Sequence, residues 1–515
     1  MTSKSSVLDY QEPLKVDRNG LPLIPQPSAS LLDPLNYPTW LKHVVLVEVS
    51  LLGFASGLAG NMTNPAVDQV LREFHISPRV ATFQSTITAA SSALAGFLLV
   101  PFANIYGHRI VFLVSSLLTA VFSICAAELK TFGSLVAFRG LAGVYWVNII
   151  VGVAAISSIF FAHQKGRAIG FFTVVAFNGS HLAPIVGGFV ASRFGWRWTL
   201  RLAAIIMGVM TIIIAFMLPD TLFQRPNQAN ALVVCTELDK ITDSNMTSEL
   251  HRPPALTFST YLRYLRLVDR ERMPSRGLRL SDFFSPYQML RHPFVIFPAL
   301  NNAIVTTYSF LGPLTIGPVQ FTEVFHFDAA QNGLAMGLSL ILGTFIGEFF
   351  SGPATDFFIQ RTRRNGQNPE PEVRLRSIWL GAAIVPLGLL MYVHHFIQLH
   401  SIFVLHSRKL LVHALGLDLE FSSEYVSTDG FTIHYATTFI APCVALAFTC
   451  VGAQISSSVC YTYACSDCYP KRSGDISQIF NFIRGLSILA LSFYEQPLGK
   501  RIGYHIEFTL FAIIW

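Results

Sequence analysis

Charged residues are scarce in this chain: 13% of its 515 residues are Asp, Glu, Lys or Arg, while 52% are hydrophobic. With a mean hydropathy of +0.49, this composition excludes an ordinary soluble globular protein of the same length. Apolar runs long enough to cross a bilayer recur along the chain, so the composition predicts a polytopic, all-α membrane protein whose surroundings are lipid.

Other absences narrow the function classes. The seven cysteines, an odd number, predict no disulfide framework, and the net charge of +6 calls for no nucleic-acid partner. The sequence contains no Gly-x4-Gly-Lys-Ser/Thr loop, no HExxH, and no second pair to match Cys465-Ser-Asp-Cys468. We therefore expect no ATP-driven pumping and no metal catalysis: no enzyme, no cofactor and no metal site.

Composition changes divide the chain into four parts. Residues 1–42 are polar and rich in proline, which predicts a disordered cytoplasmic tail; residues 43–218 hold six apolar spans. Residues 219–290 form a charged central loop, in which Leu256–Arg272 is either an amphipathic surface helix or, the reading we favour, a solvated linker. Residues 291–515 hold the second group of spans.

The second group of spans has two irregularities. Residues 398–432 show no clear period and are interpreted either as a long outer loop or as translated intron sequence. The eleventh span is expected at 476–494, and the last begins near Gly503, so about a dozen residues cover roughly 18 Å of a ~30 Å hydrocarbon core. We expect the twelfth helix to be cut short.

Small residues recur at helical spacing between positions 170 and 188. On a helix, Gly179, Ala183 and Gly187 share one face that carries almost no side chain, so a second helix can approach it backbone to backbone, and Pro184 bends the segment. The pattern resembles the fifth-helix antiporter motif of the major facilitator superfamily, with one departure, Ala183 for Gly. The matching residues are Gly170, Gly179, Ala183, Pro184, Gly187 and Gly188.

Two further segments resemble the gating loops of that superfamily, one in each half. In PFANIYGHRIVF, Asn104 stands at the acid position, and Gly107 and Arg109 at the turn glycine and a basic position. In SGPATDFFIQRTRRNG the corresponding residues are Gly352, Asp356 and Arg361, so the acid that is missing at Asn104 is present at Asp356. Two such loops predict an internal repeat, with Asp356 as a gate latch.

Polar and charged side chains inside apolar spans are costly in hydrocarbon and commonly mark a transport pathway. Glu48 is the first candidate for substrate charge or for a proton, with snorkelling or a neighbouring-helix pair as the alternative. Arg139 either faces a cavity or pairs with Glu128. The full set of substrate or proton candidates is Glu48, Arg139, Asn301, Tyr308, Glu348 and Arg484.

The resemblance implies a major facilitator fold of two pseudo-symmetric six-helix bundles, in the fungal drug:proton antiporter branch. It implies secondary active transport of a small organic solute, amphipathic or cationic, by alternating access coupled to protons. We expect a monomer in the plasma membrane with both termini cytoplasmic, because most of the 36 Lys and Arg residues fall on the inner segments.

Two alternatives stay open at this point. One is a nutrient sensor of the same fold that binds its ligand without moving it. The other is a non-functional, mis-spliced or truncated product, since both irregularities of the second half are of that kind.

Overall fold

The computed structural model describes most of the chain: residues 14–16, 23, 25–28, 30–81, 83–223, 248–250, 257–267, 269, 271, 273, 277–364, 371–392, 439–468, 472–502 and 504–514. The segment 398–432, interpreted from the sequence as a loop or as intron, lies outside these residues.

The described chain is almost entirely helical. Ten of its helical stretches are long and apolar enough to cross a membrane, and each of them falls on a span expected from the sequence. In the first half the elements are α1 (Thr39–Asn61), α2 (Val67–Phe74), α3 (Pro78–Ala81), α4 (Phe83–Tyr106), α5 (His108–Glu128), α6 (Phe132–Ala142), α7 (Val147–Ile159), α8 (Ala162–Phe194) and α9 (Trp196–Met217), with the 3-10 turns η2 (Asn64–Ala66) and η3 (Gly143–Trp146).

The second half follows the central loop. Its elements are α12 (Leu280–Phe284), η4 (Pro286–Arg291), α13 (Pro293–Ile304), η5 (Val305–Leu311), α14 (Gly312–Phe325), α15 (Ala329–Arg364), η6 (Pro371–Ser377), a helix over 378–392, α18 (Ile440–Thr462), η7 (Tyr463–Cys468), α19 (Ser473–Ile502) and α20 (Tyr504–Ile514). The seventh span, which the apolar pattern places at about 294–316, consists of α13, η5 and α14 in series, with the π-helical η5 at its middle. The expected twelfth span corresponds to the 11 residues of α20.

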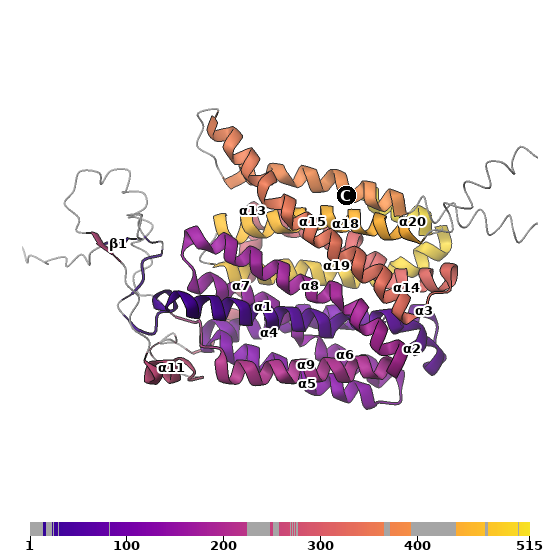
Figure 1. Cartoon of the computed structure of the whole chain (residues 1–515), viewed down its shortest axis with the longest axis horizontal. Coiled ribbons are helices and arrows are strands. Elements are labelled where there is room, and N and C mark those ends of the chain that lie inside the picture. Colours follow the sequence, from indigo (N-terminus) through magenta and orange to yellow (C-terminus); the bar gives the residue numbers. More distant parts are fainter. Residues whose placement is uncertain are drawn as a thin grey trace, which may run out of the picture.

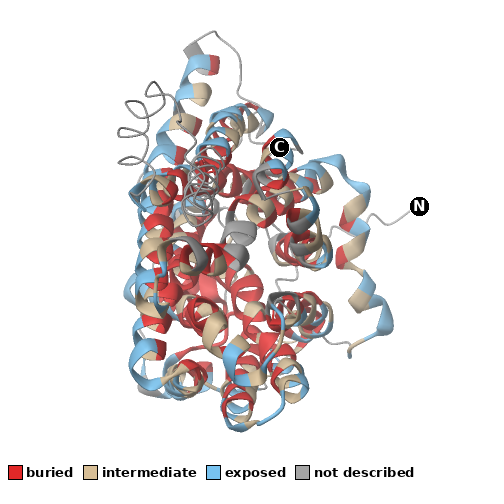
Figure 2. Ribbon diagram, turned by 90° about the vertical axis from the view of Figure 1, so that its right-hand side faces the viewer, coloured by how far each residue is buried: buried red, intermediate tan, exposed pale blue. Residues whose placement is uncertain are grey.

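The long helices run side by side, with the first half on one side of the bundle and the second half on the other (Figure 1). Seen end on, buried residues gather between the helices and exposed residues face outward (Figure 2). Many of the exposed side chains are large and apolar, among them Phe216, Phe349 and Trp379, each more than 70% exposed. An apolar outer surface of this kind suits lipid rather than water, and the architecture is the all-α, two-bundle membrane fold that the sequence predicts.

Helix α8 has glycines where α1 presses against it. A Cβ atom added at Gly179 would collide with the main-chain carbonyl of Phe54, and one at Gly187 with the carbonyl of Met62. Ala183, between them on the same face, is fully buried. The predicted backbone-to-backbone approach at this motif is confirmed, and α1 is the partner helix.

A second face of α8 packs equally closely against α15 of the other half. A Cβ at Gly188 would collide with the carbonyl of Ala329, and one at Gly333 of α15 would collide with the carbonyl of Pro184. At the opposite end of the motif, a Cβ at Gly170 would lie 3.8 Å from Oε1 of Glu348, also on α15. The motif therefore lies at a seam between the two halves, which the sequence alone did not indicate.

Helix α1 begins at Thr39, four residues before the span expected from residue 43, and the segment before it contacts the central loop. Tyr37 packs against Tyr264 of the short helix α11 (Phe258–Tyr264) with tilted rings whose centroids are 4.7 Å apart, and its hydroxyl donates to the Asp220 carbonyl (2.9 Å). Further out, the strands β1 (Leu14–Val16) and β2 (Ser248–Leu250) pair in parallel.

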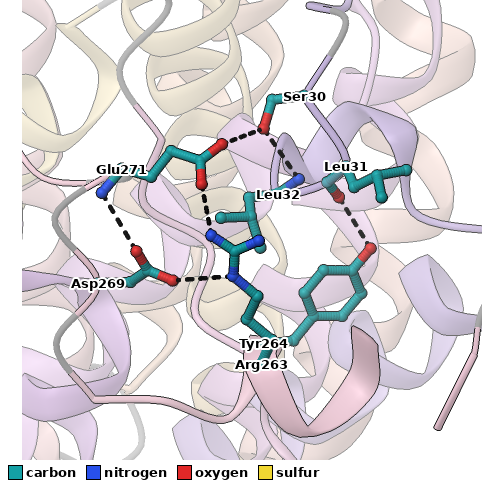
Figure 3. Close-up of polar contacts among 7 residues, drawn as sticks. All are labelled: Ser30, Leu31, Leu32, Arg263, Tyr264, Asp269 and Glu271. Atoms are coloured by element: carbon teal, nitrogen blue, oxygen red, sulfur yellow. Dashed lines mark hydrogen bonds and ion pairs between the residues drawn. The ribbon is translucent and has the colours of Figure 1, made fainter. Parts of the chain in front are cut away.

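Polar contacts join the same segment to the central loop (Figure 3). The Ser30 hydroxyl donates to Glu271 (3.1 Å), and the Tyr264 hydroxyl donates to the Leu31 carbonyl (2.8 Å). Arg263 forms ion pairs with Asp269 and Glu271. The described part of Leu256–Arg272 is thus held against the N-terminal segment and is not a purely solvated linker.

The glycine contacts of α8 predict the effect of one added methyl group. Replacing Gly179 with Ala forces α1 and α8 apart, since a main-chain carbonyl blocks the new atom, and we expect a loss of about 1–3 kcal/mol in folding free energy. Thermal unfolding of the purified protein in detergent measures it. Gly208→Ala on α9, where a Cβ would meet no atom within 4 Å, is the matched control. Equal melting temperatures for the two variants would contradict the close approach.

Candidate functional site: a polar cavity between the two halves

A cavity of about 110 Å³ lies between the two halves. The first half lines it from α1, η2, α4, α6, η3 and α8, and the second half from η5, α18 and α19. Its polar lining residues include Asn61, Asn64, Arg139, His181, Gln454, Ser457, Arg484 and Glu495, and its aromatic ones are Tyr145, Trp146 and Phe177. A cavity with a mostly apolar wall and a few polar groups has the character of a small-molecule site.

Arg484 of α19 is the charge that most directly joins the halves at this cavity. Its guanidinium lies 4.2 Å from the ring centroid of Trp146, which belongs to η3 of the first half. One Nη donates to Asn481 (2.8 Å), and the Asn481 amide in turn donates to the Ser92 carbonyl of α4 (3.3 Å). A guanidinium carries five N–H donors, and the bond to Asn481 is the one hydrogen bond that Arg484 donates among the described residues, so donors remain for a ligand.

Arg139 lines the other side of the cavity. Its Nη atoms donate to the Thr63 hydroxyl (3.4 Å) and the Gly60 carbonyl (3.3 Å) at the end of α1. The alternative that Arg139 pairs with Glu128 is wrong, because Glu128 forms its ion pair with Arg201 (2.9 Å). Arg139 and Arg484 are the two sequence candidates that the structure brings together at the cavity.

Two titratable residues at the cavity were missing from the candidates. His181 of α8 shares a hydrogen bond with the Thr344 hydroxyl of α15 (2.7 Å), and it therefore also connects the halves. Glu495 of α19 is 3% exposed and lines the cavity. The sequence analysis ended the eleventh span at 494, whereas α19 continues to Ile502 through Pro497, so an acid that looked terminal is inside the helix.

The remaining candidates lie outside the lining. Glu348 accepts hydrogen bonds from Gln454 (3.1 Å) and Ser458 (3.4 Å), so it stands behind a lining residue. Tyr308 shares a hydrogen bond with the hydroxyl of Tyr494, the residue before Glu495 (2.6 Å).

Asn301 and Glu48 are farther from the cavity lining. Asn301 accepts a hydrogen bond from the Cys460 thiol of α18 (3.5 Å). Glu48 is 5% exposed, and its carboxylate oxygens have no hydrogen-bond partner among the described residues. The first candidate of the sequence analysis is therefore buried, as expected for an acid inside a span, but it does not line the cavity.

The loop between α4 and α5 is organised by an acid from the end of the first half. Gly107 has φ = +116°, a conformation that favours glycine, and a Cβ there would collide with the Asp220 carboxylate. Asp220 accepts hydrogen bonds from the main-chain N–H groups of His108 (3.1 Å) and Leu222 (3.2 Å). It therefore caps the N-terminus of α5, a role that the sequence analysis did not assign to it.

The other basic and polar positions of that loop have distinct contacts. Arg109 donates to the carbonyls of Leu265 and Ala215 (2.6 Å to the latter), which anchors the central loop to this end of the bundle. The Asn104 amide reaches the Asp475 carboxylate in the first turn of α19 (3.5 Å). Asp475 also lies 3.8 Å from Arg472. The acid absent from position 104 is thus supplied by the facing helix of the other half.

The corresponding segment of the second half lies in the C-terminal part of α15. Gly352 lies in α15, and a Cβ there would meet no atom within 4 Å. Arg361 is exposed near the end of the same helix. The Asp356 side chain lies outside the described part of the structure, so its role as a latch stays a prediction.

Membrane-capable helices arranged in two halves around a shared polar cavity define the class of polytopic membrane carriers. The family model of the Major Facilitator Superfamily matches residues 49–412. The chain therefore belongs to the Major Facilitator Superfamily, and it is a membrane transport protein rather than an enzyme.

Individual relatives agree with this membership. The chain is 25% identical to the efflux pump radE of Floropilus chiversii over 80% of this chain and 73% of that protein. It is 26% identical to the MFS-type transporter penM of Penicillium rubens over 70% and 67% of the two chains. The inward-open, partially occluded xylose transporter XylE of E. coli has the same fold, with a TM-score of 0.55 at 12% identity over 92% of this chain and 96% of that one.

The capping role of Asp220 predicts a graded effect of substitution. Asp220→Ala removes the acceptor of the α5 N-terminus and should lower the folding free energy by about 1–2 kcal/mol, whereas Asp220→Asn keeps an acceptor and should cost less. Thermal unfolding of the full chain tests the order wild type, Asn, Ala. An Ala variant as stable as the Asn variant would show that Asp220 does not act as a cap.

Proposed function

We propose that this protein exports an amphipathic organic solute by alternating access, in exchange for protons. The observation that carries the proposal is the cavity at the boundary of the two halves, where each half contributes an arginine and polar groups to one space. A site at such a boundary is emptied or closed when the halves move relative to each other. The name of radE as an efflux pump supports the outward direction.

The chemistry of the cavity favours an acceptor group on the solute. Two guanidinium groups and one carboxyl group, Glu495, face the cavity, so positive charge is in excess and a purely cationic solute is disfavoured. We propose that a carbonyl or carboxylate of the solute accepts a hydrogen bond from Arg484, while its apolar body packs on Trp146 and Phe177. We therefore propose a solute with a hydrogen-bond acceptor group in place of the cationic solute expected from the sequence.

Glu495 is the carboxyl group that we assign to proton coupling. It follows Arg484 by eleven residues on α19, about 16 Å along the helix axis at 1.5 Å per residue. A hydroxyl or amine of the solute that donates to Glu495 favours the ionised carboxylate, so solute and proton compete for the same group. Such competition is what an exchange of one for the other requires. Glu48 has no part in this proposal, because it does not line the cavity.

We propose that the protein is a monomer in the plasma membrane, with both termini on the cytoplasmic side. The distribution of the 36 Lys and Arg residues supports this orientation, since most fall on the tail and loops at the same side of the expected spans.

A flux assay in liposomes tests the proposed transport. Fluorescein and rhodamine 123 share a xanthene ring system, but fluorescein offers a carboxylate where rhodamine 123 carries a methyl ester and a delocalised cation. We expect a pH gradient to drive fluorescein transport by the reconstituted chain, with rhodamine 123 at least ten times slower. Arg484→Gln should slow fluorescein transport at least tenfold. Glu495→Gln should remove the dependence of transport on the pH gradient while leaving the exchange of solute for solute.

Arg193→Gln is the matched control for this assay, because Arg193 is exposed at the end of α8 and lies outside the cavity lining. Faster transport of rhodamine 123 than of fluorescein would contradict the acceptor-bearing solute. Transport by wild type that ignores the pH gradient would contradict proton exchange. Binding without flux would favour the sensor over the transporter.

We further propose that the Asn104–Asp475 contact holds the ends of α4 and α19 together in one transport state. Asn104→Asp places two carboxylates where one amide and one carboxylate now meet, a repulsion on the order of 4 kcal/mol at an effective dielectric of about 20. We expect this variant to open the α4–α19 end, measured by thiol labelling of a cysteine introduced at Ser477.

The exchanged double variant Asn104→Asp/Asp475→Asn restores one amide and one carboxylate, and labelling should return to the wild-type rate. Asn104→Ala, which removes the contact without adding charge, should fall between the two. Labelling that is the same in all four proteins would rule out a role for this contact in closure.

A further inference from the structure

A second hollow, of about 470 Å³, lies on the outside of the same α4–α19 seam. It is lined almost wholly by apolar and aromatic groups from α4, α12, η4 and α19. The residues that shape it are Leu94, Phe97, Phe284, Tyr287, Phe482 and Leu486, and we call it the aromatic groove. Leu94 is 57% exposed, Phe284 56% and Leu486 48%, so the groove opens to the outer surface of the bundle.

Aromatic rings build one wall of this groove. Phe97 contacts Phe284 and Tyr287, with ring centroids 5.7 and 5.8 Å apart. Tyr287 packs edge-on against Phe482 at 5.1 Å. Its hydroxyl is held by the Gln478 amide (3.4 Å) and therefore points away from an apolar ligand. Tilted and edge-to-face ring pairs of this kind are favourable contacts, so they hold this wall of the groove in place.

The floor of the groove is a close contact between small residues. A Cβ at Gly485 of α19 would lie 2.8 Å from the Cβ of Ala93 on α4, so no side chain fills the space outside this contact. Arg484, the residue before Gly485, lines the central cavity, and Asn481 is its hydrogen-bond partner. The groove and the cavity have no lining residue in common, so the occupant of the groove is distinct from the transported solute.

Three arginines lie close to the groove's lining residues in the chain or in contact with η4, where the central loop enters the second half. Arg279 precedes α12 directly, and Arg291 ends η4, about 8 Å beyond Tyr287 at the 2 Å rise of a 3-10 helix. Both are exposed. Arg472, 44% exposed, contacts the Met289 sulfur of η4 (3.2 Å).

The acids among the described neighbours leave this end positive. Asp282 accepts from the Arg279 main chain (2.9 Å), and Asp475 is the ion-pair partner of Arg472. Three arginines therefore face two acids, and the exposed guanidinium groups are placed for an anion. Apolar surface in the membrane layer beside basic groups at its edge is the arrangement that recognises an anionic lipid.

From this geometry we propose that the aromatic groove binds one acyl chain of an anionic membrane phospholipid, whose phosphate headgroup rests on Arg279 and Arg291. The bound lipid contacts α4 of the first half together with α19 and η4 of the second. It therefore stabilises the state in which Gly485 is seated against Ala93. The proposal depends on the membrane-embedded fold alone and is independent of the solute and of proton coupling.

The test compares two lipids with identical acyl chains. Purified full-length protein in detergent is titrated with phosphatidylserine or phosphatidylcholine, and binding is read by native mass spectrometry and by the shift in melting temperature. We expect the wild type to retain phosphatidylserine at least ten times more tightly than phosphatidylcholine. Leu94→Trp, which fills the groove, should lose that binding. Leu117→Trp on α5, where Leu117 is 52% exposed and outside the groove, is the matched control and should retain it.

A second variant tests the headgroup assignment separately. In Arg279→Gln/Arg291→Gln the groove is intact, so phosphatidylserine and phosphatidylcholine should bind equally. Equal binding of the two lipids by the wild type would overturn the proposal, as would retention of phosphatidylserine by Leu94→Trp at the level of Leu117→Trp. Stabilisation by ergosterol that exceeds that by phosphatidylserine, and that Leu94→Trp abolishes, would assign the groove to a sterol instead.

Discussion

The structure depends on main-chain carbonyls that press against glycines of α8. At Gly179 and Gly187 the neighbour is α1, and at Gly188 it is the start of α15. Contacts of this kind form without side chains, so they bring helices within the shortest distance that backbones allow, and packing of this type replaces the hydrophobic effect inside a bilayer. Because α8 serves both neighbours, any relative movement of the halves has to shear or open the α8–α15 contact.

The central cavity follows from this packing. Because α8 is held close to α1 and α15, the size of the space between the halves depends on the side chains at their other contacts. His181, Trp146 and Arg484 lie at this space, and each contacts the opposite half. Buried charge in such a space is expensive, and the structure offsets it with local partners. These are the Gly60 carbonyl and the Thr63 hydroxyl for Arg139, and Asn481 with the Trp146 ring for Arg484. Among the described residues these contacts use three of the ten N–H donors of the two guanidinium groups, so both arginines keep donors for a ligand.

The inner side, the outer side and the end of the α4–α19 seam differ in chemical character. Its inner side carries the polar groups of the cavity, its outer side carries the aromatic groove, and its end carries the Asn104–Asp475 contact. One line of contact between the halves is thus exposed to solute, to lipid and to the aqueous loop region. A ligand at any of the three positions acts on the same equilibrium between open and closed seams.

The sequence alone determined the membrane class, the order of the spans and the packing face at residues 170–188. These three features follow from the lengths of apolar runs and the spacing of small residues, which depend on local composition and helical period. Asn104, Arg139 and Arg484 could likewise be singled out, since a polar group in or beside an apolar span is visible in one dimension. Tertiary structure alone decided which of them share a space. Glu48 and Arg139 look equally placed along their spans, yet only Arg139 faces the cavity, because the direction of a side chain depends on how its helix is rotated against its neighbours. Asp220 and Asp475 acquire their roles from helices more than a hundred residues away in the chain, and no local pattern carries that information.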